Sequence, residues 1–243
     1  MTTSPEDSGA EVCVIIPAAG SGTRLGEPVP KAFVDLGGAT IIERCVDNIP
    51  DSLGASIVVV VPADLVEHAR ELLPGVVVVS GGAHRSDSVR AGIAAAGTAR
   101  ILLVHDAARP LTPAHVFTSV VEAVAAGHPA VVPGVPVVDT LKQVTSDASG
   151  LELVARTVDR EELRAVQTPQ GFTRDALLRA HSDDSGLATD DAGLAERCGI
   201  PVHIVPGDPL AMKITTPWDL RIIRDVVRES AADAEARSVE ARS

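Results

Sequence analysis

The sequence has very few aromatic side chains: its 243 residues include no tyrosine, one tryptophan and three phenylalanines. This scarcity argues against the aromatic stacking platforms on which single-stranded nucleic acids are commonly bound. Its core must therefore consist of Val, Ile, Leu and Ala, and 45% of the residues are hydrophobic. This composition favours a parallel β-sheet covered by helices.

Positive charge is also scarce, and the formal net charge is −12 at pH 7. Nucleic acid and anionic membranes are poor partners for such a surface, although a nucleotide can still bind where cations converge on one cleft. No apolar run approaches the length of a membrane span. The first residues have neither the basic region nor the apolar stretch of a secretion signal. We therefore expect a cytoplasmic protein that binds neither nucleic acid nor membranes.

Only three cysteines occur, at positions 13, 45 and 198, and none forms a C-x-x-C pair. Each lies in an apolar or helical context. We therefore interpret the three residues as reduced structural thiols.

The hydrophobic pattern alternates between strands and helices through about residue 135. This alternation predicts an α/β fold with a doubly wound, mostly parallel, Rossmann-like sheet, whose ligands bind beyond the carboxyl ends of the strands. The expected strands are residues 12–16, 56–61, 76–80, 101–105 and 130–138. The expected helices between them are residues 40–48, capped by Thr40, 63–73, 86–96 and 113–126.

The second half of the chain departs from this alternation. Residues 139–145 and 151–158 flank a polar turn and predict a β-hairpin. The later elements are expected to be helices at 173–182, 189–198 and 217–228, with short strands at 202–205 and 212–214. We therefore expect one domain over residues 11–228 with a β-arm at about 138–160, a disordered segment at 1–10 and a flexible tail at 229–243.

One stretch, VCVIIPAAGSGTRLGEPVPKAF at residues 12–33, joins a buried strand to a loop of small residues and two cations. Its three loop glycines leave backbone N–H groups uncovered, and such groups bind anions, above all phosphate. Arg24 offers a planar fork and Lys31 a point charge for phosphate oxygens. The spacing matches neither a P-loop nor G-x-G-x-x-G. A lone G-x-G is equally compatible with an ordinary glycine-rich turn, but this loop has more: Ala18 and Ala19 leave the strand tip open, and Pro30 and Lys31 close the segment.

A second loop, GGAHRSDSV at residues 81–89, leads from an expected strand into an expected helix. Its paired glycines allow backbone groups to approach a ligand closely. Ser88 provides a hydroxyl early in the helix, and Arg85 provides a cation. The alternative is an ordinary helix start capped by Ser86.

A third segment, VHDAARP at residues 104–110, follows the expected fourth strand. Asp106 at the end of that strand, facing a triphosphate, is a natural Mg²⁺ ligand, because Mg²⁺ needs only one or two carboxylates beside water and phosphate oxygens. Arg109 is placed to hold a second phosphate. We interpret His105 as a structural residue rather than a ligand.

These segments resemble a known family. PAAGSGTR at residues 17–24, followed by Pro30 and Lys31, is similar to the signature of nucleotidyltransferases that join a nucleoside triphosphate to a sugar or polyol phosphate. VHDAARP narrows the resemblance to the 2-C-methyl-D-erythritol 4-phosphate cytidylyltransferases. Four further segments support it, and the matches run in order from Val12 to about Leu220. These segments are VDTLK (138–142), RTVDR (156–160), QTPQ (167–170) and AMKITTPWDL (211–220).

The resemblance implies that CTP and 2-C-methyl-D-erythritol 4-phosphate give 4-diphosphocytidyl-2-C-methyl-D-erythritol and pyrophosphate, in the non-mevalonate isoprenoid pathway. We assign Arg24 and Lys31 to charge stabilisation at the transferring phosphorus, and Asp106 to Mg²⁺. The residues expected to bind CTP are Pro17, Ala18, Ala19, Gly20, Ser21, Gly22, Gly82, Ala83, Ser88, Asp106 and Ala107. Those expected to bind methylerythritol phosphate are Asp106, Arg109, Thr140, Arg160, Thr189 and Lys213.

The resemblance also implies a homodimer, because in this family an arm at this place crosses to a second subunit. Thr140 and Arg160 would then act in the site of the partner. The alternative from the residues alone is an edge hairpin on the same sheet.

Two other functions share parts of the pattern. A ribitol-5-phosphate cytidylyltransferase would have the same loop, fold and arm. A nucleotide-sensing module without catalysis would not need Arg24, Lys31, Asp106 and Lys213 together. One residue departs from the family, since Ala32 stands where Gln is frequent; we expect an effect on packing beneath the loop rather than on a catalytic group.

Overall fold

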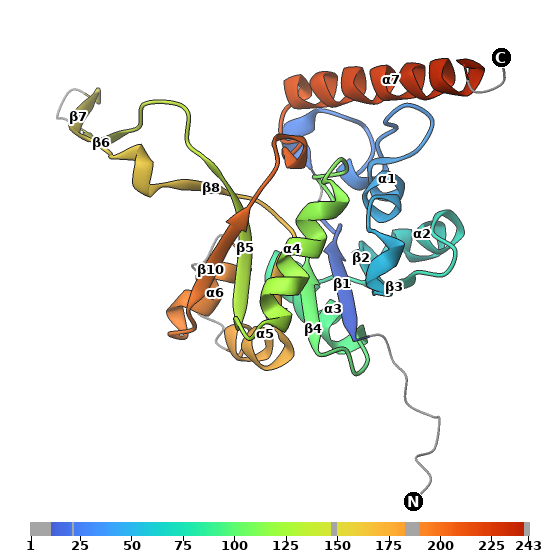
Figure 1. Ribbon diagram of the computed structural model, residues 1–243, viewed down its shortest axis with the longest axis horizontal. Coiled ribbons are helices and arrows are strands. Elements are labelled where there is room, and N and C mark those ends of the chain that lie inside the picture. The colour runs from blue at the N-terminus through green and yellow to red at the C-terminus, as the bar shows by residue number, and fades with distance from the viewer. Residues whose placement is uncertain (1–10, 21, 147–149, 183–189, 241–243) are drawn as a thin grey trace, which may run out of the picture.

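A large mixed sheet forms the centre of the fold (Figure 1). The structure is a computed structural model that describes residues 11–20, 22–146, 150–182 and 190–240. Seven strands follow the order β10-β5-β9-β4-β1-β2-β3, and β8 pairs with β5 at the side. The strands are β1 (Val12–Pro17), β2 (Ser56–Val61), β3 (Val77–Ser80), β4 (Ile101–Val104), β5 (Ala130–Pro136), β8 (Arg164–Val166), β9 (Gln170–Thr173) and β10 (Val202–Pro206). This confirms the predicted doubly wound, mostly parallel sheet.

The strand order reverses beside β1. From β1 the chain moves outward through β2 and β3, then returns to place β4 against the other edge of β1. Both neighbours are parallel to β1, with Val14 opposite Ile57 on one side and Leu103 on the other. Such a reversal opens a crevice beyond the carboxyl ends of the two strands, where ligands bind in open α/β sheets.

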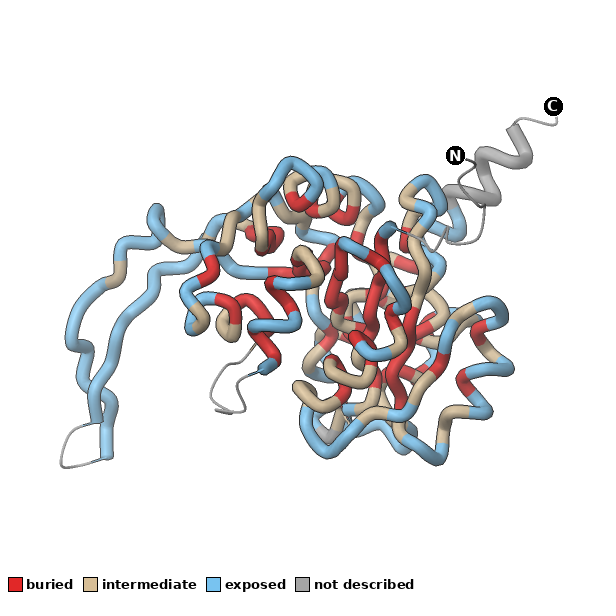
Figure 2. The backbone as a smooth tube through the Cα atoms, turned by 90° about the horizontal axis from the view of Figure 1, so that it is seen from below, coloured by how far each residue is buried: buried red, intermediate tan, exposed pale blue. Residues whose placement is uncertain are grey.

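Alternating apolar residues of the strands face two separate helix layers. On one face, Val14 and Ile16 belong to a cluster with residues of α1 (Ile41–Asp47), α2 (Val66–Leu72) and α4 (Ala114–Ala125). On the other face, Cys13 and Ile15 pack with α3 (Arg85–Ala95), α5 (Arg174–Ala180) and α6 (Asp191–Arg197). Figure 2 shows that the buried backbone follows the strands between these layers. The core is aliphatic, as the composition predicts.

Two strands that the sequence did not indicate complete the sheet. Antiparallel β9 lies between β4 and β5, and β8 pairs with the end of β5. The residues of β9 read QGFT, which is neither a continuous apolar run nor a regular alternation. The prediction of a strand at 212–214 was wrong. Ile214 instead donates its backbone N–H to the carbonyl of Ala108 (2.8 Å), and its side chain is buried in a cluster with residues of the last helix.

The helix boundaries follow capping side chains. Thr40 caps α1 through the predicted capping box with Glu43. Helix α3 begins one residue earlier than expected, and Asp87 accepts the backbone N–H of His84 (3.0 Å), so Ser86 is not the cap. Asp190, rather than Thr189, caps α6. Thr189 itself lies outside the described residues.

The predicted hairpin forms an arm of its own. Strands β6 (Lys142–Ser146) and β7 (Glu152–Thr157) pair antiparallel in a separate two-stranded sheet, which excludes the alternative of an edge hairpin on the main sheet. Both strands are exposed along their whole length, and the arm projects away from the domain (Figures 1 and 2). Val144, Leu153 and Val154 are among its exposed apolar residues.

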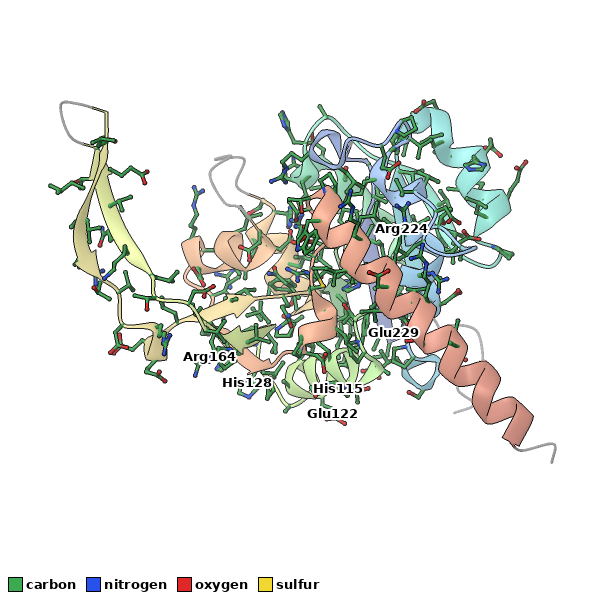
Figure 3. The ribbon with its side chains drawn as sticks, turned by 90° about the horizontal axis from the view of Figure 1, so that it is seen from above. His115, Glu122, His128, Arg164, Arg224 and Glu229 are labelled. Carbon is green, nitrogen blue, oxygen red and sulfur yellow. The ribbon has the colours of Figure 1, made fainter. Side chains whose placement is uncertain are left out.

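The last helix closes the end of the domain. Helix α7 (Pro217–Glu240) continues beyond its predicted end at residue 228. Arg224, labelled in Figure 3, donates to the carbonyl of Asp35 (3.1 Å) and lies 3.8 Å from a carboxylate oxygen of Glu27. These contacts fasten α7 over the segment that follows the first loop. Within the described part of the chain, no helix combines the length and the apolar character needed to cross a bilayer.

The capping box of α1 gives a test of local stability. Thr40 Oγ1 accepts the backbone N–H of Glu43 (3.3 Å), while the Glu43 carboxylate accepts the Thr40 backbone N–H (2.7 Å). Thr40→Ala should lower the unfolding free energy by about 1 kcal/mol in urea titrations, and Thr40→Ser by only a few tenths, because serine keeps the hydroxyl. Equal losses in the two variants would contradict this role of the hydroxyl.

Candidate active site

A pocket of about 320 Å³ opens where β1, β3 and β4 end. It brings together most of the residues that the sequence analysis assigned to CTP and to catalysis, and it adds Lys213 from the other end of the chain. The predicted residues that line it are Pro17, Ala18, Ala19, Gly20, Gly22, Arg24, Lys31, Gly82, Ala83, Ser88, Asp106, Ala107 and Lys213. Ala32, His84, Arg85 and Ala108 also line the pocket and were not among the predicted site residues.

Other predicted site residues lie elsewhere. Thr140 and Arg160 line a second hollow of about 330 Å³ at the base of the arm. Arg109 does not line the first pocket: its Nη1 donates to the carbonyl of Ala211 (2.5 Å), two residues before Lys213. Ser21 and Thr189 are outside the described residues. Within one subunit, the arm residues therefore do not share a pocket with Lys31.

The first loop folds tightly because of a glycine. Gly22 has φ +63°, and a Cβ at this position would collide with the Cβ of Lys31. Only glycine allows this backbone conformation and this close approach together. Leu25 donates its backbone N–H to the carbonyl of Gly22 (2.9 Å), which closes the turn. The loop therefore holds Arg24 and Lys31 against the same pocket.

The pocket concentrates positive charge on an acidic protein. Among the described residues that line it, Arg24, Lys31, Arg85 and Lys213 carry cationic side chains, and only Asp106 carries a carboxylate. Crowded cations of this kind stabilise a bound polyphosphate, because the anion replaces their mutual repulsion with attraction. The expectation that cations converge on one cleft is met by the geometry.

Asp106 is held between two of these cations. Lys213 Nζ donates to its Oδ2 (2.6 Å), and Arg85 Nη2 lies 3.5 Å from its Oδ1. Burial by itself would raise the pKa of Asp106, but Arg85 and Lys213 outweigh it and lower the pKa to about 2. The carboxylate is thus ionised at neutral pH and can act only as an acceptor or a metal ligand.

Lys31 lines the pocket and is partly buried. Its Nζ donates to the carbonyl of Ile214 (2.5 Å). Burial, and next the nearby charge of Lys213, lower the pKa of Lys31 to about 8. The amine therefore remains mainly protonated near neutral pH, with a charge that an incoming anion stabilises.

The residues around Asp106 hold its backbone in place. The Asp106 N–H donates to Thr168 Oγ1 (3.0 Å), and this hydroxyl also lies 3.0 Å from Nδ1 of His105. His105 is fully buried, and its burial lowers its pKa to about 4, so the ring is neutral. Its ring packs 4.9 Å from that of Phe117. His105 therefore has the structural role expected from the sequence.

Comparison with known proteins identifies the family. The family model described as 2-C-methyl-D-erythritol 4-phosphate cytidylyltransferase matches residues 12–229. The chain belongs to this family. The match covers both the pocket and the arm.

Named relatives agree with this assignment. The 2-C-methyl-D-erythritol 4-phosphate cytidylyltransferase of Rhodococcus jostii is 53% identical over 93% of this chain and 99% of its own. That of Nocardia farcinica is 54% identical over 93% and 98%. Among solved structures, the enzyme of the same name from Thermus thermophilus has a TM-score of 0.72 at 38% identity over 90% of this chain and 99% of its own. The 4-diphosphocytidyl-2C-methyl-D-erythritol synthase of Anaerococcus prevotii has a TM-score of 0.78 at 25% identity over 90% and 97%.

The lowered pKa of Lys31 predicts how its contribution to stability changes with pH. Below about pH 8 the amine is protonated in both the folded and the unfolded chain, so its burial destabilises the fold in full. Between about pH 8 and 10.5 the unfolded chain binds more protons, so stability rises with pH. Lys31→Met should therefore be more stable than wild type at pH 7, by about 1 kcal/mol after allowance for solvent screening.

The comparison requires urea unfolding of both proteins at pH 7 and at pH 9.5. Because every other group titrates in both proteins, the difference between them isolates Lys31. The advantage of Lys31→Met should shrink at the higher pH. An advantage that is constant or grows with pH would contradict the lowered pKa.

Proposed function

We propose that this chain transfers a cytidylyl group from CTP to 2-C-methyl-D-erythritol 4-phosphate, releasing pyrophosphate in a step of the non-mevalonate isoprenoid pathway. The observation that carries the proposal is the convergence of three loops and Lys213 on one cationic pocket, in a chain that belongs to the family of this name. The relatives named above carry the same activity in their names.

The reaction requires no nucleophile from the protein. An oxygen of the methylerythritol phosphate attacks the α-phosphorus of CTP, and the bond from that phosphorus to the oxygen bridging to the β-phosphorus breaks. Pyrophosphate leaves with the electron pair of that bond. The attacking phosphate is largely dianionic near neutral pH, since its second pKa is about 6, and needs no general base. The protein must instead gather anions and stabilise the charge at phosphorus, the role we propose for Arg24 and Lys31.

Different loops are proposed to bind the triphosphate and the base of the nucleotide. We propose that the loop after β1 holds the triphosphate through the backbone N–H groups of Ala19, Gly20 and Gly22, and that Gly82, Ala83 and Ser88 hold the cytosine. The described lining contains no Phe, Trp or Tyr. A pocket with small residues and backbone groups at this position suits a pyrimidine, which is recognised by hydrogen bonds along its edge.

Asp106 fits a magnesium ion that binds together with the nucleotide. Its carboxylate is ionised and lines the pocket. The described residues contain no cluster of three or more His, Cys, Asp or Glu side chains that could hold a metal alone. One carboxylate with triphosphate oxygens and water is a usual Mg²⁺ environment. Bound there, the ion would neutralise charge on the phosphates, while Arg85 keeps the carboxylate in position.

We also propose that the protein is a homodimer in which the arm of one subunit completes the site of the other. The arm is a two-stranded sheet, exposed throughout, and such a hairpin is marginally stable by itself. Arg160 donates to the carbonyl of Val138 (2.6 Å), which places its side chain beside Thr140 in the hollow at the base of the arm. In the dimer this hollow would meet the methylerythritol phosphate of the partner.

A cytoplasmic location is part of the same proposal. The structure contains Cys13, Cys45 and Cys198 as free thiols. Unpaired cysteines are typical of reducing compartments.

The first test is pyrophosphate release from CTP with Mg²⁺, with methylerythritol 4-phosphate and ribitol 5-phosphate offered in parallel. We expect release only with methylerythritol 4-phosphate. Release only with ribitol 5-phosphate would preserve the nucleotide site but overturn the proposed acceptor. Binding of CTP without release from either acceptor would favour a nucleotide sensor.

The shared site predicts that two inactive variants complement each other. Arg160→Ala removes an arm residue, and Lys213→Ala removes a pocket residue. In a mixed dimer, one of the two sites combines the intact pocket of one subunit with the intact arm of the other. Random mixing should therefore restore about a quarter of wild-type activity. Mixtures that stay as inactive as either variant alone would show that each residue acts within its own subunit.

A further inference from the structure

A buried carboxylate outside the pocket has no role in the function described so far. Asp191, the first residue of α6, is fully buried. Its Oδ2 accepts from Arg85 Nη2 (2.7 Å), and its Oδ1 lies 2.9 Å from Nε2 of His181. Burying a carboxylate is costly unless it is paired and hydrogen-bonded. Helix α6 does not need this carboxylate, because Asp190 already caps it through the N–H of Gly193 (2.9 Å).

Asp191 reaches the pocket through Arg85. The same Arg85 nitrogen that binds Asp191 lies 3.5 Å from Oδ1 of Asp106, and Arg85 lines the pocket. Burial opposes the charged guanidinium, but Asp191 and then Asp106 raise the pKa of Arg85 above its usual value. One guanidinium therefore connects a carboxylate in the pocket with a carboxylate behind it.

Hydrogen bonds hold the start of α6, which carries Asp191, against the central sheet. Gln170 in β9 donates its Nε2 to Asp190 (2.7 Å), and its Oε1 accepts the backbone N–H of Ala192 (3.0 Å). Both bonds tie the start of α6 to a strand within the central sheet. His181, at the end of α5, holds the Asp191 carboxylate from its other side. Both sequence neighbours of Asp191 are thus bound to β9, and its side chain is bound to His181 and Arg85.

The two cations beside Asp106 differ in how they are held. Lys213 has a flexible stem and a side chain 44% exposed, and its amine donates to Asp106. Arg85 is fastened from behind by Asp191. A phosphate entering the pocket can draw Lys213 away from Asp106, whereas Arg85 is also bound to Asp191, a fully buried carboxylate that does not line the pocket.

We propose that Asp191, held by His181, positions Arg85 so that Asp106 keeps a fixed counter-ion while Lys213 turns to the incoming phosphate. This inference rests on the proposed function. Without that restraint Arg85 would be free to bind the triphosphate instead, and Asp106 would shift away from the anions around it. CTP would then bind equally well or better, while turnover would fall. Arg85, Asp191 and His181 are thus positioning residues rather than catalytic ones.

The test is a double-mutant cycle with Asp191→Asn and Arg85→Lys, measured as kcat and as KM for CTP. Asparagine is nearly isosteric but cannot form the ion pair, and lysine replaces the planar guanidinium with an ammonium on a flexible stem, which does not keep the same fixed position between the two carboxylates. We expect each single variant to lower kcat by about tenfold or more, with KM for CTP unchanged or lower. The double variant should lose no more than the worse single variant, because both changes break the same connection. Losses that multiply, or a raised KM with unchanged kcat, would overturn the proposal.

Thr40→Ala serves as the matched control for a simple loss of stability. It lies at the start of α1, away from the residues proposed to act, and should keep wild-type kcat. If Asp191→Asn lowers the melting temperature but keeps its kcat, as Thr40→Ala should, the carboxylate is merely structural and the proposal is wrong. If Asp191→Asn does not fold, Arg85→Lys decides: unchanged kcat in that variant overturns the proposal.

A crystal structure of Asp191→Asn gives an outcome that does not depend on turnover. We expect Arg85 to leave Asp106 and turn into the pocket, and finding both side chains in their original places would contradict the inference. Absence of activity in the wild-type protein would instead contradict the proposed function. The two failures are therefore distinguishable.

Discussion

The parallel pairing of β1 with β4 is the constraint on which the site depends. Because these strands lie side by side and end at the same edge, the loop after β1 and the segment after β4 must share one crevice. The loop after β1 carries Arg24 and Lys31, and the segment after β4 carries Asp106. The parallel neighbour β2 then places β3, and with it the loop at residues 81–83, on the far side of β1. Three segments far apart in the sequence therefore meet at one edge of the sheet.

The cations at this edge are anchored before any substrate arrives. Lys31 is bound to the carbonyl of Ile214 and Arg109 to that of Ala211, while Lys213 is bound to Asp106. Each anchor is a neutral carbonyl or a carboxylate that phosphate can replace or supplement. Orienting charged side chains in advance reduces the reorganisation needed when charge develops at phosphorus. The acidic surface elsewhere leaves this pocket as the place where an anion is best received.

The sequence predicted the parts of the fold that depend on local pattern. Consecutive apolar residues define β1, β2 and β4, and Thr40 with Glu43 fixes the start of α1. Strand β9 was not predicted, because QGFT has no strand pattern of its own and becomes a strand only between β4 and β5. Arg85 was noted as a cation, but its connection to Asp191 spans 106 residues and exists only in the folded chain. Asp191 could be recognised from the sequence only as an acidic residue in the first turn of a helix.

The two halves of the chain supply different sides of the reaction that we propose. The loops after β1, β3 and β4 come from the first half and line the pocket where the nucleotide is proposed to bind. Lys213, the arm and the start of α6 come from the second half, and all are proposed to act on the acceptor or on Asp106. Because Asp106 and Arg109 are also expected to bind the acceptor, a change of acceptor within this fold would require changes after β5 and beside these two residues, while the loops at residues 18–22 and 81–83 stay intact. The Asp191–Arg85 contact joins the halves, because α6 belongs to the second and α3 to the first. Through this contact, the position of α6 affects Arg85 and, through Arg85, the Asp106 carboxylate in the nucleotide pocket.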